Sequence, residues 1–217
     1  MRRLILFAKR PRLGRVKTRL VPPLTPEQAL ELYRAFLADQ LRFLESMRPR
    51  YAIELCLDGP DRSIAPEGIV VTEQGPGDLG RRMLAAMVRS HDSGARATVI
   101  IGADAPTLPA NHVHTAFERL DATDPAVISP AEDGGYVLIG LREPRPHLFH
   151  EIAWGGSSVC AATRRRAAEA GLSLFELPVW YDVDDAESLE RLRAQLQAVT
   201  ARQRAPETSR VVERLRR

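Results

Sequence analysis

Short apolar runs of strand length recur along the chain, and segments with a helical spacing of hydrophobic residues lie between them. The runs are bounded by Gly, Pro, Asp and Ser residues, which are typical of turns. The run from Ala97 to Gly102 is apolar almost throughout, as expected of a central strand that is covered on both faces. Predicted strands cover residues 4–8, 51–57, 68–71, 97–102, 125–129, 136–141 and 172–179.

The helical pattern between residues 26 and 46 has both a start signal and an apolar stripe. Thr25 and Gln28 form a predicted capping box, with Pro26 at the first helical position. The stripe consists of Leu30, Tyr33, Leu37, Leu41 and Leu44. Further helices are predicted over residues 78–90, 109–120, 157–170 and from about 185. This alternation predicts an α/β fold, a three-layer αβα sandwich with a mostly parallel central sheet and ligands at the carboxyl ends of its strands.

Length and composition indicate one globular domain. The chain has 217 residues, of which 44% are hydrophobic and 27% charged. We expect the domain to cover residues 1–200, followed by a basic C-terminal tail or an extra helix at 201–217. No apolar run approaches the ~18 residues of a membrane span, so we expect a cytoplasmic protein without a membrane partner. Cys56 and Cys160 are not flanked by metal-ligand spacings, which predicts neither a zinc site nor a disulfide.

The chain keeps both of its lysines, Lys9 and Lys17, in one short basic segment, although it carries 31 Lys and Arg residues in total. Residues 1–26 hold eight basic side chains and no acid. A lysine is a flexible point charge that suits a phosphate oxygen. A strand, a basic loop with a glycine and then a helix is the local architecture of many nucleotide phosphate sites. The alternative is a solvated basic loop. The candidate phosphate-binding residues here are Lys9, Gly14, Lys17, Thr18 and Arg19.

Two acidic positions are candidates for a metal site. Asp104 follows the predicted central strand, where a carboxylate can hold Mg²⁺ while substrate phosphates and water complete the coordination shell. Its alternative role is to cap the following turn. Asp184, with Asp182 as its substitute, lies where the last predicted strand gives way to a helix. Asp184 followed by Glu187 is also a good helix start without any metal.

Two glycine-rich loops and a tryptophan add further candidates. Gln74, Asp78 and Gly80 lie in a loop before a helix, where they could bind a base or sugar, with Arg81 or Arg82 available for phosphate, or serve only as loop and cap. The turn from Asp133 through Gly134 and Gly135 to Tyr136 allows close approach to an acceptor molecule, or serves as a hairpin-like connector. Trp154 could be a substrate lid or a packed side chain.

In this order the motifs resemble the glycosyltransferase-A-like nucleotidyltransferase superfamily, also called the nucleotide-diphospho-sugar transferase type. That superfamily includes the molybdenum cofactor and 2-phospho-lactate guanylyltransferases and a bacterial branch of glycosyltransferase-like proteins. The matching segments are residues 8–20, 77–83, 101–106, 130–136 and 182–189. The resemblance implies that Lys17 and Arg19 hold nucleotide phosphates and that Asp104 and Asp184 bind the metal. The segment 182–189 departs from the Asp-Thr-Pro-Glu-Asp-Leu that is usual in relatives.

We therefore expect a transferase that depends on Mg²⁺ or Mn²⁺ and moves a nucleotidyl group from a nucleoside triphosphate to a small acceptor, with Lys17, Asp104 and Asp133 as its catalytic residues. One alternative is a glycosyltransferase that uses a nucleotide sugar. Another is a binding module for nucleotide or nucleic acid, although we expect no nucleic-acid partner because aromatic residues are only 6% of the chain. The sequence is compatible with a homodimer.

Overall fold

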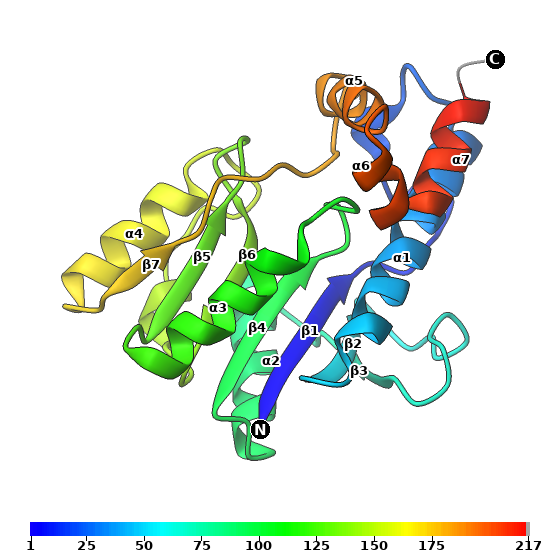
Figure 1. Ribbon diagram of the computed structural model, residues 1–217. Helices are drawn as coiled ribbons and strands as arrows, with labels where there is room; N and C mark the ends of the chain where they lie inside the picture. The colour runs from blue at the N-terminus through cyan, green and yellow to red at the C-terminus, as the bar shows by residue number, and fades with distance from the viewer. Residues whose placement is uncertain (216–217) are drawn as a thin grey trace.

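The computed structural model, which describes residues 1–215, has a seven-stranded central sheet (Figure 1). Its strands are β1 (Arg2–Ala8), β2 (Ala52–Leu57), β3 (Val70–Glu73), β4 (Ala97–Gly102), β5 (Ala126–Pro130), β6 (Tyr136–Leu141) and β7 (Leu174–Glu176). They lie in the order β3-β2-β1-β4-β6-β5-β7. Every neighbouring pair is parallel except the two that involve β6.

Helices cover both faces of this sheet. The long helices are α1 (Pro26–Met47), α2 (Leu79–Asp92), α3 (Ala110–Ala122), α4 (Val159–Glu169) and α5 (Ala186–Gln195). The shorter ones are α6 (Val199–Arg204), α7 (Pro206–Arg214) and the 3₁₀ turns η1 (Thr18–Leu20) and η2 (Pro146–Phe149). The capping box predicted at the start of α1 is present, with both Thr25 and Gln28 making their bonds.

The alternation of side chains along β1 separates the two layers of core. Leu4 and Leu6 belong to a buried cluster that also contains residues of α1, α3, α5 and α7. Ile5 and Phe7 belong to a second cluster, which is built with residues of α2, η2 and α4. Successive side chains of a strand point to opposite faces, so one strand supplies both layers. The predicted fold class, a three-layer αβα sandwich with a mostly parallel sheet, is confirmed.

The antiparallel direction of β6 decides at which edge of the sheet the β5–β6 loop lies. β5 and β6 are antiparallel neighbours joined by residues 131–135, so this segment is the hairpin-like connector that the sequence left open. β5 runs parallel to β4, because each of them pairs antiparallel with β6. The β5–β6 turn therefore lies at the edge where β1 and β4 end, which is where ligands bind in sheets of this kind.

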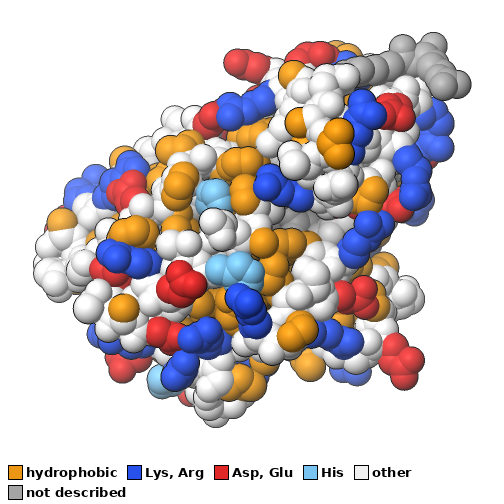
Figure 2. Space-filling model, viewed as in Figure 1, with side chains coloured by type: hydrophobic (Ala, Val, Ile, Leu, Met, Phe, Trp, Pro, Cys, Tyr) orange, Lys and Arg blue, Asp and Glu red, His pale blue; other side chains and the backbone are white. Residues whose placement is uncertain are grey.

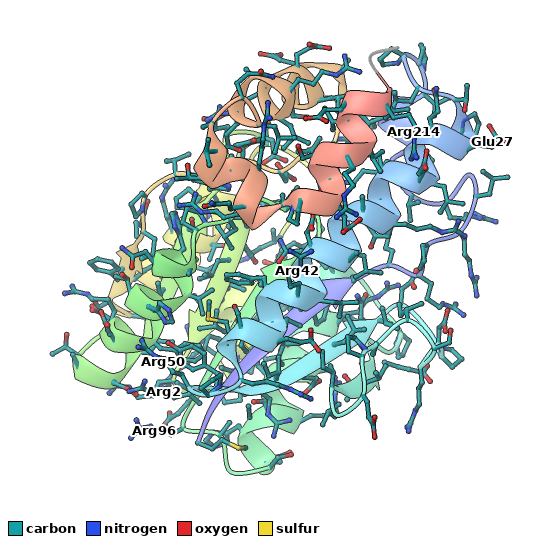
Figure 3. All side chains as sticks on the ribbon, turned by 45° about the vertical axis from the view of Figure 1, so that its right-hand side comes forward. Arg2, Glu27, Arg42, Arg50, Arg96 and Arg214 are labelled. Carbon is teal, nitrogen blue, oxygen red and sulfur yellow. The ribbon has the colours of Figure 1, made fainter. Side chains whose placement is uncertain are left out.

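The end of the described chain packs back on its beginning. In Figure 3, α7 lies along α1, and Arg214 of α7 forms an ion pair with Glu31 of α1. The buried Asp39 of α1 accepts hydrogen bonds from the backbone N–H groups of Glu207 (3.0 Å) and Thr208 (2.8 Å). Residues 199–214 thus form extra helices. Of the predicted tail 201–217, residues 216–217 lie outside the described part, and the boundary near residue 200 stays a prediction.

Candidate active site

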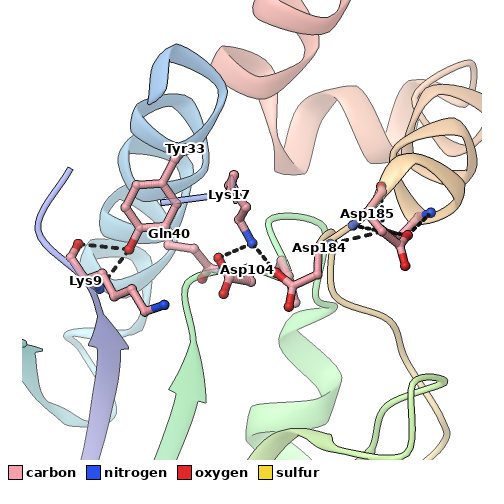
Figure 4. Close-up of polar contacts among 9 residues, drawn as sticks. Lys9, Lys17, Tyr33, Gln40, Asp104, Asp184 and Asp185 are labelled. Atoms are coloured by element: carbon pink, nitrogen blue, oxygen red, sulfur yellow. Dashed lines mark hydrogen bonds and ion pairs between the residues drawn. The ribbon is translucent and has the colours of Figure 1, made fainter. Parts of the chain in front are cut away.

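A buried lysine joins two carboxylates beside the end of β4 (Figure 4). The Lys17 ammonium lies 2.5 Å from Asp104 Oδ1 and 2.7 Å from Asp184 Oδ1, with its side chain 2% exposed. Asp104 follows β4, and Asp184 follows the extended segment after β7. Two segments far apart in the sequence therefore meet around one cation.

A backbone hydrogen bond holds the Asp104 and Asp184 segments next to each other. The N–H of Val183 donates to the carbonyl oxygen of Asp104 at 2.9 Å, so the main chains of the two segments are bonded next to the two carboxylates. Lys17 itself has φ 50°, in the left-handed region that a residue with a side chain seldom adopts. Such strain persists only where the surroundings hold it, and it is common at functional sites.

Electrostatics favour the charged forms of Lys17 and Asp184. Burial acts to lower the pKa of Lys17, but the charges of Asp104 and Asp184 outweigh it and the pKa is raised. Burial also opposes ionisation of Asp184, and Lys17 outweighs it, so that the pKa of Asp184 lies below its usual value. Asp182 differs. Burial, followed by repulsion from Asp133 and Asp184, raises the pKa of Asp182 to about 7.

Asp185, and not Asp184, is the N-cap of α5. The Asp185 side chain accepts from the N–H of Ser188 at 2.9 Å, and Ser188 bonds back to the backbone N–H of Asp185 in a capping box. The alternative assignment of Asp184 as the helix cap is therefore wrong. The sequence Asp184-Asp185 offers two carboxylates in succession, and the residue nearer the helix takes the cap. Asp184 is left to contact Lys17.

Helix α1 contributes two groups that sequence reasoning missed. The hydroxyl of the buried Tyr33 accepts from the N–H of Lys9 (2.8 Å) and donates to the carbonyl oxygen of the same residue (2.9 Å). The side-chain amide of Gln40 donates to the carbonyl oxygen of Ala105 at 2.6 Å. Tyr33 belongs to an apolar stripe, and no signal in the sequence separates it from ordinary core residues. These bonds hold the ends of β1 and β4 against α1.

A cavity of about 580 Å³ opens along this edge of the sheet. The predicted site residues that line it are Lys9, Gln74, Asp78, Asp104, Asp133, Gly135, Tyr136, Trp154, Asp182 and Asp184. Gly14, Lys17, Thr18, Arg19, Gly80 and Gly134 are not among its lining residues. Lys17 reaches the cavity only through its two carboxylate partners, whereas the exposed Lys9 lines it directly. Sequence reasoning missed Tyr33 and Asp58, which also line it.

The loop before α2 is committed mainly to structure. The buried Gln74 donates from its side-chain amide to the carbonyl oxygens of Ala8 (3.0 Å) and Cys56 (3.2 Å). Asp78 is the N-cap of α2 and accepts from the N–H of Arg81 at 2.8 Å. A Cβ on Gly80 would lie 2.3 Å from the Trp154 ring, so this glycine makes room for the indole. These contacts agree with the alternative in which the residues serve as loop and helix cap. Gln74 and Asp78 also line the cavity.

The predicted acceptor loop has its own internal order. Asp133 accepts from the N–H of Gly135 at 2.8 Å. Gly134 has φ 89° and packs so closely on Ser157 that a Cβ would lie 1.9 Å from the carbonyl oxygen of that residue. Tyr136 and Trp154 meet edge to face, with ring centroids 6.4 Å apart. Asp133 and Trp154 thus both line the cavity.

Asp104 and Asp184 fit a divalent metal whose remaining ligands come from the substrate. Asp104 and Asp184 already place one oxygen each around a single cation, the Lys17 ammonium. Among residues 1–215, Asp104 Oδ1 is buried and has no hydrogen bond of regular geometry, only this ion pair, so a lone pair remains for a metal. Within residues 1–215 there is no group of three or more His, Cys, Asp or Glu residues that could hold a metal. A pair of carboxylates is typical of Mg²⁺ sites that are completed by phosphates.

Comparison with solved structures places this fold. The protein matches a bacterial protein from Desulfovibrio desulfuricans G20, provisionally named a nucleotide-diphospho-sugar transferase, with 31% identity over 98% of this chain and 97% of that one and a TM-score of 0.86. A CMP:2-keto-3-deoxy-manno-octonic acid synthetase, solved in complex with CTP, matches with a TM-score of 0.52 and 14% identity over 91% of this chain and 99% of that one. A 4-diphosphocytidyl-2C-methyl-D-erythritol synthase from Anaerococcus prevotii matches with a TM-score of 0.58 and 11% identity over 91% of this chain and 98% of that one.

The protein therefore has the fold of the nucleotide-diphospho-sugar transferases, as the resemblance implied. It belongs to the family described as an uncharacterized protein conserved in bacteria (DUF2064), which matches residues 40–156. Comparison with the curated proteins found no match. None of the helices within residues 1–215 combines the length and apolar character that a bilayer span requires. The names of the related proteins support the prediction of a transferase.

Proposed function

We propose that this protein is a metal-dependent transferase that uses a nucleotide, moving a nucleotidyl group from a nucleoside triphosphate to a small acceptor. The observation that carries this proposal is the meeting of Asp104, Asp184 and Lys17 beside a cavity that the exposed Lys9 also lines. Carboxylates for a metal and amines for phosphate are the two requirements for gripping a polyphosphate.

Each residue has a defined task in this reaction. The acceptor oxygen forms a bond to the α-phosphorus, the bond from that phosphorus to the bridging oxygen of the β-phosphate breaks, and pyrophosphate leaves. Asp104 and Asp184 would hold Mg²⁺ or Mn²⁺, which would neutralise phosphate charge. Lys9, Lys17 and Arg19, whose charges all act on Asp184, would stabilise the departing pyrophosphate. Positioning and charge supply most of the rate, because phosphoryl-type displacement needs little covalent help from the protein.

The acceptor end of the cavity carries the candidate base. Asp133 is a catalytic residue predicted from the sequence, and Asp182 lines the same cavity with its pKa raised to about 7 by burial and then by the charge of Asp133. A carboxylate with a pKa near the working pH is a more effective proton acceptor than an ordinary one. We therefore add Asp182 beside Asp133 as the group that takes the proton from the acceptor hydroxyl.

A glycosyl transfer is the second candidate, and the 31% identity with a protein named for nucleotide sugars favours it. In this version the acceptor oxygen forms a bond to the sugar carbon, and a nucleoside diphosphate leaves with the electron pair of the broken bond. The two metal-holding carboxylates and the lysines keep the same tasks, because the leaving group again contains a diphosphate.

A nucleic-acid module is a poor fit to the surface. On the face shown in Figure 2, Lys and Arg side chains are mixed with Asp and Glu instead of forming one continuous basic area. The cavity also collects acidic residues, among them Asp104, Asp133, Asp182 and Asp184. Such an arrangement repels a bare phosphate backbone, which binds to continuous positive surfaces.

The test is a product screen. Purified protein is incubated with nucleoside triphosphates and nucleotide sugars, each with Mg²⁺ or Mn²⁺ and a panel of hydroxyl acceptors, and released pyrophosphate and nucleoside diphosphate are measured separately. Pyrophosphate release that depends on the acceptor and stops with EDTA supports nucleotidyl transfer, and diphosphate release supports glycosyl transfer. Metal-dependent nucleotide binding without either product across the panel would instead identify a binding module.

A further inference from the structure

The Lys17 ammonium depends on two partners that the proposed metal also needs. Its contacts are Asp104 Oδ1 at 2.5 Å and Asp184 Oδ1 at 2.7 Å, and its other close neighbour is the ring of the fully buried Phe36, whose centroid lies 5.6 Å away. An aromatic face adds only modest attraction. If the carboxylates took another cation, the buried ammonium would lose its compensation, which is costly in a protein interior.

A divalent ion and the ammonium therefore compete for the same pair of carboxylates. With Lys17 in place, two negative charges face one positive charge. With a divalent ion added and Lys17 unmoved, three positive charges would gather on the same pair, and the ion and the ammonium would repel each other at close range. The two Asp side chains are each 40% exposed, so an ion can approach them from the cavity, whereas Lys17 contacts them from the protein side.

We propose that Lys17 is a positioning residue that holds the two carboxylates together before the metal binds and leaves them when it binds, so that its ammonium turns to the nucleotide phosphates. This inference rests on the proposed function, in which Asp104 and Asp184 hold the metal, and adds to it an exchange of partners by Lys17. Metal and nucleotide then favour each other's binding, because the metal frees the lysine that the phosphates need.

The first test removes the competitor. Lys17→Met keeps an unbranched apolar stem and deletes the charge, so Mn²⁺ alone, titrated without nucleotide and followed by calorimetry and by electron paramagnetic resonance, should bind at least tenfold more tightly than to the unchanged protein. Lys9→Met is the matched control, because Lys9 lines the same cavity and has no ion pair with either carboxylate within residues 1–215. Its Mn²⁺ affinity should change by less than threefold. Equal or weaker Mn²⁺ binding to Lys17→Met overturns the proposal.

The second test uses the unchanged protein, so it can be done even if the Lys17→Met variant does not fold. The chain has two lysines, and protein labelled with ¹⁵N at the lysine Nζ therefore gives a spectrum with one internal reference. A buried, paired ammonium exchanges its protons slowly. Saturating Mg²⁺ should shift the Lys17 signal and speed its proton exchange, while the Lys9 signal changes little. A Lys17 signal that stays unchanged while calorimetry shows Mg²⁺ bound overturns the proposal, as does the absence of Mg²⁺ and Mn²⁺ binding to both the unchanged and the Lys17→Met protein.

These outcomes separate the two levels of the argument. EDTA-sensitive transferase activity with an unmoved Lys17 signal leaves the proposed function standing and removes the partner exchange. A Lys17 signal that moves with Mg²⁺, in a protein that turns over no nucleotide or nucleotide sugar in the panel, supports the exchange and removes the transferase.

Discussion

At the residue scale, the site depends on the charge of one carboxylate at the end of β4. Asp104→Asn keeps the shape of the side chain and removes the charge that faces Lys17 at 2.5 Å. We expect kcat/KM to fall by roughly a thousandfold or more, equivalent to about 4 kcal/mol of transition-state stabilisation, because both the metal and the placement of Lys17 are affected. The measurement is product release at saturating metal. Asp61→Asn, in an exposed loop, is the control, and activity within tenfold of normal for Asp104→Asn would remove the metal role.

A histidine outside the cavity gives a prediction on pH. His112 of α3 is buried against the carbonyl oxygen of Pro178 (3.2 Å), and this burial lowers its pKa below the usual value. Below the unfolded pKa of about 6.5, the unfolded chain takes up a proton that the folded chain refuses, so stability falls as the pH drops from about 7 toward the lower folded pKa.

His112→Gln, which can still donate to Pro178, should flatten this loss. Denaturant unfolding of both proteins between pH 8 and pH 5 measures it, and the difference between their curves should have a slope of up to about 1.4 kcal/mol per pH unit. Parallel curves would show that His112 does not contribute to the pH dependence.

At the element scale, α2 and the Trp154 loop are shaped to each other at Gly80. A Cβ there would lie 2.3 Å from the indole ring, so Gly80→Ala must displace Trp154 from its place between α2 and the rings of Tyr136 and Phe149. We expect a loss of about 1 to 3 kcal/mol in unfolding free energy from this overpacking, together with a red shift of the Trp154 emission and a higher KM for the acceptor.

In the control for this prediction, the effect of Gly80→Ala on the unfolding free energy should change sign. In a Trp154→Ala background the obstacle is gone, and Gly80→Ala should then stabilise the protein, by less than the ~0.8 to 1 kcal/mol that alanine gains over glycine in a helix interior, because Gly80 is the second residue of α2. A double-mutant cycle measures the coupling. Equal effects of Gly80→Ala in both backgrounds would mean that the indole does not press on α2.

At the scale of the whole molecule, the last described helix closes on the first. Asp39 accepts from two N–H groups of α7 across 168 and 169 residues of sequence, and it is 1% exposed. Asp39→Ala leaves these N–H groups unpaired, so we expect a loss of about 1 to 3 kcal/mol and a fall of several degrees in Tm by calorimetry, at about 2 to 4 °C per kcal/mol for a chain of this size. Asp92→Ala, at the exposed end of α2, should leave Tm within one or two degrees.

Periodicity predicted the layers of the fold because each strand and helix buries one repeating set of side chains. The end of β4 was predicted to the residue, and α1 to within one residue of its end. The antiparallel place of β6 was not predicted, because a strand's partner depends on contacts distant in sequence. In the site, the two lysines stood out by their rarity, and Asp104 by its position just after a predicted strand. Tyr33 and Gln40 act through hydroxyl and amide bonds to backbone, which have no pattern in sequence, and the choice between Asp184 and Asp185 as cap is a matter of local geometry.

The bond from the N–H of Val183 to the carbonyl oxygen of Asp104 has a consequence for how such a site can vary. It is made by main chain alone, so replacing side chains around the cavity leaves this link between the backbones of the two segments intact. The loops around the cavity could then change in sequence while the backbones that carry Asp104 and Asp184 stay linked. Variety in acceptors and constancy in donor handling are what a scaffold built in this way would produce.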